Sequence, residues 1–261
     1  MRRMVTIRVT CFDVLLTLLL VLPARQVKAQ MNAPLSQEIT GDGVGAHVSE
    51  SISSFEGNTS GIMVGLGAVL GVRAGKQFSY LNVSADYAHL AGETLIAKAF
   101  AYARTNYELS PGLWSEVFGQ MESDRIRRIS LRERVGAGPR ILLFQSQSTS
   151  LFFGTSYMLE YTRLIPDQTN VDESSVAHRC SNYLTLNWKI GPTMALSETF
   201  YAQPRFDAPK DLHLLNTTSL QFKLTSHLSS HIDTMVRYDT REIVQTKQFD
   251  VAVKNMLDLR F

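Results

Sequence analysis

The last fourteen residues alternate between apolar and polar side chains, and this pattern constrains the fold more than any other feature of the sequence. From Gln248 to Phe261, one set of alternate positions reads Phe, Val, Val, Asn, Leu, Leu, Phe and the other reads Gln, Asp, Ala, Lys, Met, Asp, Arg. A strand sorts such residues onto two faces, whereas a helix would scatter them around its circumference. Strands of soluble proteins usually have about five or six residues, so this length favours a tilted membrane-spanning strand.

The same period of two recurs upstream and marks twelve candidate strands. They span about residues 46–56, 61–72, 77–89, 94–107, 112–122, 126–143, 148–163, 176–190, 193–203, 213–226, 231–240 and 248–261. The two faces of 93–122 are hard to tell apart because alanines alternate there with mixed side chains, so ten strands also remain open. An open sheet would leave unpaired edges in lipid, so we predict an all-β fold, a closed transmembrane antiparallel up-and-down β-barrel.

The N-terminus predicts export. Three arginines precede the apolar run Val14 to Leu22, Pro23 ends that run, and Val27-Lys28-Ala29 forms a cleavage site before Gln30. Nine apolar residues are too few to cross a bilayer as a helix, which needs roughly 20. Residues 1–29 are therefore predicted to be a cleaved signal peptide, 30–44 a flexible tail and 45–261 the barrel.

The full chain carries 26 Lys and Arg against 24 Asp and Glu, and five of those cations but only one of those anions lie in 1–29. The remainder has no basic excess that would indicate nucleic-acid binding.

The connections predict an orientation. One set of turns is short and includes Ser110-Pro111-Gly112 and Gly191-Pro192, whereas the other set includes the longer charged segments 165–175 and 203–212. Bacterial barrels have short periplasmic turns and longer outer loops, and an even strand number keeps both termini on one side. Both termini are therefore predicted to be periplasmic.

Several short segments resemble a known family. Ser53 to Ser60 (SSFEGNTS), Arg132 to Arg140 (RERVGAGPR) and Ser197 to Asp211 occur in the order and spacing of the YdiY-like, salt-induced outer-membrane proteins, also called domain of unknown function 481. The resemblance covers about residues 45–261. It implies a barrel in the cell outer membrane of a Gram-negative bacterium and a link to osmotic or salt stress, and it implies no established activity. The closing Phe261 is similar to the signal that the barrel-assembly machinery recognises.

Charged residues of one parity are candidates to line the lumen. Arg128, Arg132, Arg134 and Arg140 share one parity on a long strand, and Glu160 faces inward on the next strand. They either form a cationic ladder that sets anion preference, or belong to a solvated lumen wall balanced by carboxylates. The same parity argument adds five further residues to the predicted lumen: Lys223, Arg237, Asp250, Lys254 and Asp258.

The sequence predicts no catalytic, cofactor or metal site. His178 and Ser181 are three residues apart, so on a strand they point to opposite faces and cannot form the pair that an outer-membrane lipase would need. No histidine or carboxylate cluster has metal-ligand spacing. Most tyrosines and both tryptophans are assigned to the aromatic girdles at the membrane interfaces, Tyr80, Trp114, Tyr183 and Tyr201 among them.

Two classes of function follow. The first is a passive, porin-like small channel or a structural envelope protein, and the second is a barrel-embedded enzyme of the lipase or protease type. The expected partners are outer-membrane lipid, lipopolysaccharide and the barrel-assembly machinery, with no nucleic acid.

Overall fold

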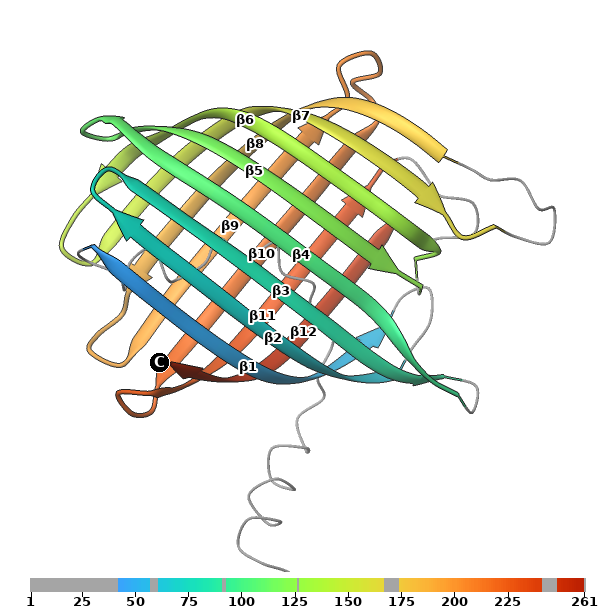
Figure 1. Ribbon diagram of the computed structural model, residues 1–261, viewed down its shortest axis with the longest axis horizontal. Coiled ribbons are helices and arrows are strands. Elements are labelled where there is room, and N and C mark those ends of the chain that lie inside the picture. The colour runs from blue at the N-terminus through green and yellow to red at the C-terminus, as the bar shows by residue number, and fades with distance from the viewer. Residues whose placement is uncertain are drawn as a thin grey trace, which may run out of the picture.

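The chain forms one closed barrel of antiparallel strands (Figure 1). The structure, a computed structural model, describes residues 42–56, 61–90, 93–125, 127–166, 174–240 and 248–260. The strands are β1 (Gly43–Glu56), β2 (Gly61–Ala74), β3 (Gln77–Leu90), β4 (Glu93–Ser110), β5 (Leu113–Asp124), β6 (Ile129–Gln145), β7 (Thr149–Leu164), β8 (Ser174–Lys189), β9 (Met194–Pro204), β10 (Leu212–Lys223), β11 (Leu228–Asp239) and β12 (Phe249–Arg260).

Each strand pairs with its neighbour in sequence, and β1 pairs with β12 to close the sheet, for example through His47 and Arg260. The predicted up-and-down barrel of twelve strands is thus confirmed, and the alternative of ten strands is wrong. Residues 93–122 form the long β4 and most of β5. The two faces of β4 looked alike because its outward positions hold small alanines, while its inward positions hold amphipathic side chains such as Tyr102 and Arg104.

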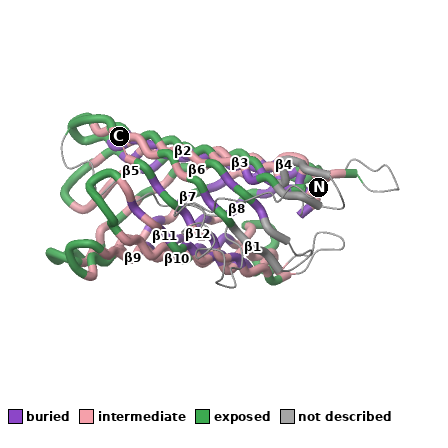
Figure 2. Tube along the Cα trace, turned by 90° about the horizontal axis from the view of Figure 1, so that it is seen from below, coloured by how far each residue is buried: buried purple, intermediate pink, exposed green. Residues whose placement is uncertain are grey.

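Side chains alternate between the lumen and the outer surface, and Figure 2 shows buried and exposed positions alternating along the strands. On β2, Val64, Leu66, Leu70 and Val72 are 40% to 53% exposed, while Met63 before them and Gly65 and Gly71 between them are buried. Large apolar side chains are exposed in this way on strands all around the barrel. A band of outward apolar residues around a polar interior is typical of a barrel that crosses a membrane.

The two ends of the barrel differ. Both Gly43 and Arg260 lie at one end, which we name the turn end, where the connections between strands are two to four residues long. The opposite end, the loop end, carries the longest connections, at 165–173, 205–211 and 240–248. This asymmetry agrees with the one that the sequence predicts.

Some of the predictions concern residues at the two ends of the chain. The signal segment 1–29, most of the tail and Phe261 lie outside the described residues. β1 begins at Gly43, so the strand includes the last two residues of the range assigned to the tail. The described residues include no helix long and apolar enough to cross a membrane.

Candidate functional site in the barrel lumen

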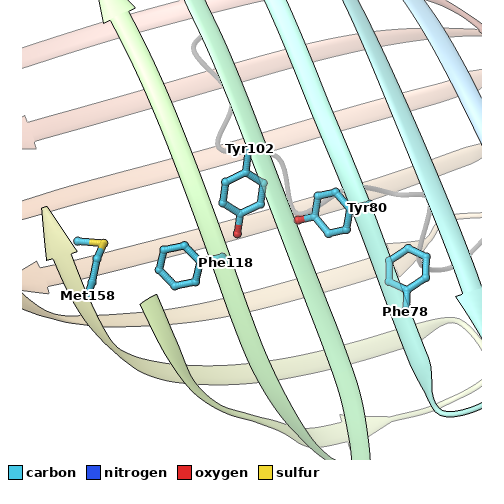
Figure 3. Close-up of a cluster of buried hydrophobic side chains, with 5 residues drawn as sticks. All are labelled: Phe78, Tyr80, Tyr102, Phe118 and Met158. Atoms are coloured by element: carbon cyan, nitrogen blue, oxygen red, sulfur yellow. The ribbon is translucent and has the colours of Figure 1, made fainter. Parts of the chain in front are cut away.

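Aromatic and apolar side chains occupy the lumen in two clusters. The first joins Phe78 and Tyr80 of β3, Tyr102 of β4, Phe118 of β5 and Met158 of β7, and Figure 3 shows them in a row on the inner wall. Successive ring centroids from Phe78 to Phe118 lie 5.9, 5.8 and 6.2 Å apart. The second cluster lies on β8 to β12 and contains Tyr183, Tyr201, Leu215, Met235 and Ala252. The interior is therefore substantially filled with side chains.

Glycines on the wall make room for this filling. A Cβ built at Gly136 of β6 would lie 2.5 Å from the ring of Phe118 and 2.8 Å from the carbonyl oxygen of Tyr157. Such distances are too short for real carbon contacts, so this position accepts only glycine while the ring stays where it is. The Gly-x-Gly that carries part of the family resemblance thus has a packing role.

An ion pair connects the two clusters. Arg104 of β4 lies with its guanidinium carbon 5.3 Å from the ring centroids of both Tyr102 and Tyr183. Its Nη1 is 3.3 Å from Glu116 Oε2, and the Tyr183 hydroxyl donates to the same oxygen at 2.6 Å. All of these groups are buried, and a charged guanidinium in such surroundings needs the carboxylate to offset its lost hydration. β4 and β8 are four strands apart, so this contact reaches across part of the lumen.

At the loop end, Arg127 joins opposite walls of the barrel. It lies in the connection between β5 and β6, where its Nη2 donates to Asp239 Oδ2 of β11 at 2.8 Å. Its guanidinium also lies 3.6 Å from Glu122 of β5 and 3.8 Å from Asp250 of β12, and its backbone N–H donates to Asp124 Oδ1 at 3.2 Å. The β5–β6 pair lies six strand positions from the β11–β12 pair in either direction around the ring. Burial lowers the pKa of Arg127, but the neighbouring carboxylates outweigh burial and raise it, so the guanidinium stays charged.

A second network at the loop end fixes the connection between β9 and β10. Glu160 of β7 accepts from Arg134 of β6 at 2.6 Å and from Arg179 of β8 at 3.2 Å. Arg179 also donates to the Asp211 carboxylate at 2.9 Å and to the Gln203 carbonyl at 3.1 Å. The Asp211 end of the connection is thereby tied to the lumen side, while Phe206 at its start stacks on the outward-facing Tyr157 with ring centroids 6.0 Å apart.

The predicted lumen residues are placed as follows. Arg132, Arg134, Glu160, Arg237, Lys254 and Asp258 are buried in the interior. Asp250 approaches Arg127, Arg140 lies beside Tyr183 near the turn end, and Lys223 is exposed at the rim of the turn end. The structure does not bring the four arginines into one ladder. Arg128 lies before β6, Arg134 pairs with Glu160, and Arg132 donates to the Thr162 hydroxyl.

The assignment of Arg128 to the lumen strand was wrong. Arg128 precedes β6 with a φ of 57°, and its side chain donates to the Ile165 carbonyl. The pairing of β6 with β7 shifts register between Ile129 and Leu131, so the alternation does not extend through this point. A bulge inverts the parity of every residue before it, and Arg127 takes the inward position instead.

The girdle assignment was wrong for part of the aromatic set. Tyr80, Tyr183 and Tyr201 are buried in the interior and Trp114 lines a cavity there, whereas Tyr107, Tyr157 and Trp188 are exposed on the outside, as girdle residues would be. Arg104, Glu116, Arg127 and Arg179 were not singled out from the sequence, although Arg104 and Arg179 lie on the inward parity of their strands. The alternation of facing along the strands places Arg104, Glu116 and Arg179 in the lumen, whereas Arg127 lies in a connection, where this signal does not apply.

The residues considered for catalysis and metal binding do not assemble. His178 is exposed on the outer face beside the Tyr157 hydroxyl, and Ser181 is buried on the inner face. In the described part of the chain, no group of three or more His, Cys, Asp or Glu side chains is arranged to hold a metal ion.

Known structures share this fold. The NanC porin is 10% identical, with 83% of this chain and 99% of that chain covered at a TM-score of 0.51. The translocator domain of the autotransporter NalP from Neisseria meningitidis is 8% identical, with 87% and 91% covered at a TM-score of 0.51. Identities this low show the fold alone, a β-barrel of the outer-membrane type.

A match at the level of sequence gives the family. No curated protein matches the chain. Residues 48–257 match the family described as "Protein of unknown function, DUF481". This range covers nearly all of the barrel, from the early part of β1 to the second half of β12. The chain therefore belongs to that family.

Proposed function

We propose that the protein is a passive outer-membrane channel for small solutes and that ion pairs across its lumen keep it narrow. The observation that carries this proposal is the Arg127 contact with Asp239, which joins opposite walls at the loop end. The outward apolar band supports a membrane location, and the charged interior suits a wet passage. Twelve strands lie between eight, where side chains fill the interior, and about sixteen, where an open channel forms.

A protein of the outer membrane has to be exported and inserted there. We infer that the protein is exported with cleavage after Ala29 and is placed in the cell outer membrane by the barrel-assembly machinery, where it contacts lipid and lipopolysaccharide. Mass spectrometry of the protein from purified outer membranes should give a mature chain that begins at Gln30. A chain that retains residues 1–29 would contradict this part of the proposal.

Conductance in planar bilayers tests the channel. The folded wild-type protein should give small single-channel steps, and Arg127→Ala should enlarge them several-fold because it removes the contact between opposite walls. Arg125→Ala is the matched control, because Arg125 is an exposed arginine of the same connection. If neither wild type nor Arg127→Ala conducts while both are folded, the channel proposal fails and a structural envelope role replaces it.

The resemblance to salt-induced proteins adds an osmotic role to the proposal. The amount of the protein in outer membranes should rise when cells are moved to higher salt, as measured by immunoblot against an unrelated barrel. An unchanged amount would remove the osmotic link and leave the channel proposal intact.

The alternative of a barrel-embedded enzyme has a direct test. Lipase and protease assays on the purified folded protein should give no activity above background, because His178 and Ser181 lie on opposite faces of β8. Activity that is lost in Ser181→Ala would favour the enzyme.

A further inference from the structure

A cavity of about 370 Å³ lies inside the barrel near the turn end. Four cations line it, Arg73, Arg104, Arg140 and Lys189, and none of the lining residues is an aspartate or a glutamate. Neutral donors such as Asn106, Thr185 and Asn187 complete its polar wall, together with the turn between β6 and β7. The cavity therefore differs in charge from the loop end, where buried arginines and carboxylates are interleaved.

Arg140 is held in place by aromatic groups rather than by an acid. Its guanidinium carbon lies 4.1 Å from the ring centroid of Phe152, and the Trp114 ring packs edge-on against Phe152 at 5.9 Å. Its Nη1 donates weakly to the Tyr183 hydroxyl at 3.4 Å. An arginine stacked in this way loses little freedom when it binds an anion, because its plane is already oriented.

The cations near the cavity differ in their acidic partners. Arg104 has Glu116 at 3.3 Å. Within the ranges that the structure describes, neither Arg140 nor Lys189 has a carboxylate oxygen within 4.0 Å of its side-chain nitrogens. The cavity thus carries a local surplus of positive charge, on Arg140, which aromatic groups position, and on Lys189 at the exposed rim.

We propose that this cavity is a binding site for a small organic anion that carries carboxylate or phosphate groups. The fork of Arg140 matches two oxygens of such a group, and Lys189 supplies a second charge at the rim. The volume lies within the range of sites for small molecules, about 300–1,000 Å³. The inference goes beyond the channel proposal, since binding here needs no passage through the loop end.

The fluorescence of Trp114 reports on the site directly. Trp114 lines the cavity, whereas the second tryptophan, Trp188, is 43% exposed on the outer face, so the titration is done in a Trp188→Phe background. The folded protein in detergent is titrated with citrate, pyrophosphate and glucose at constant ionic strength. Citrate or pyrophosphate should give a saturable change and glucose none. A response to citrate alone assigns the site to carboxylates, and a response to pyrophosphate alone assigns it to phosphates.

Single substitutions distinguish specific binding in the cavity from nonspecific attraction of anions to positive charge. Arg140→Gln should weaken binding at least tenfold and Lys189→Gln several-fold, whereas Lys223→Gln, at an exposed cation on the same rim, should leave it unchanged. If Arg140→Gln does not fold, Lys189→Gln carries the comparison alone, because its side chain makes no ion pair in the described residues. The proposal is overturned if neither anion gives a saturable response, or if Lys223→Gln weakens binding as much as Arg140→Gln. Conductance measured separately keeps this outcome distinct from a failure of the channel.

Discussion

Tyr183 covers Gly154, the residue paired with it on the neighbouring strand, so closely that a Cβ built at Gly154 would lie 2.2 Å from Tyr183 Cζ. The missing side chain lets the tyrosine lie against the wall of β7 while its hydroxyl reaches Glu116 on β5. A ring raised from the wall would lose that hydrogen bond and its contact with Arg104. The glycine thus sets the position of a side chain that connects the two clusters of the lumen.

A methyl group at this glycine should therefore destabilise the barrel. Gly154→Ala is expected to lower the free energy of unfolding by about 1–3 kcal/mol, the usual cost of overpacking. Urea unfolding in lipid vesicles measures it. The matched control is Gly119→Ala, because a Cβ at Gly119 meets no atom within 4 Å. Equal stability of the two variants would mean that the tyrosine moves aside without cost.

The position of the outer face in the membrane can be tested with arginines placed at two depths in the bilayer. Val117 lies near the middle of β5 and is 58% exposed, while Leu109 is 54% exposed one residue from the end of β4. Val117→Arg should cost about 2–4 kcal/mol and Leu109→Arg about 0–1 kcal/mol, because a charge costs most at the bilayer midplane. Refolding titrations in vesicles give both values. Similar costs at the two depths would contradict a membrane that spans the middle of the strands.

Much of the fold could be predicted because each strand carries its own signal. The period of two depends only on residues within a strand, so the order and facing of the strands followed from the sequence, most clearly for β12. The signal failed where the backbone departs from the regular strand. At Arg128, a positive φ and a register shift next to it broke the parity that the prediction extended through the connection.

The arrangement of the lumen could be predicted only in part, because its contacts join distant segments. Arg127 and Asp239 are 112 residues apart in sequence, and their meeting depends on barrel shape and side-chain reach. Aromatic residues were misplaced for a related reason. A tyrosine such as Tyr201 suits both a membrane interface and a half-polar lumen, so its type does not decide which face is inside. Parity does decide, once a neighbouring strand fixes the inward set.

The pair of Lys254 and Asp86 offers the sharpest test of how the lumen is held together. Lys254 Nζ of β12 lies 3.1 Å from Asp86 Oδ1 of β3, and both residues are buried. β1 and β2 lie between these strands. Gly65 of β2 leaves the space, since a Cβ there would lie 2.1 Å from Asp86 Oδ1 and 3.2 Å from Lys254 Nζ. The pair therefore spans the seam where the first strands meet the last.

Removal of either charge should leave the other buried without its partner. Lys254→Gln and Asp86→Asn are each expected to cost about 3 kcal/mol in the free energy of unfolding. The double variant should cost clearly less than the sum of the two, because it strands no charge. Lys223→Gln, at an exposed lysine, should stay within about 0.5 kcal/mol of wild type. The free energies of unfolding of wild type, both single variants and the double variant, measured in lipid, form a double-mutant cycle. Strictly additive costs would show that the two side chains do not stabilise each other across the seam.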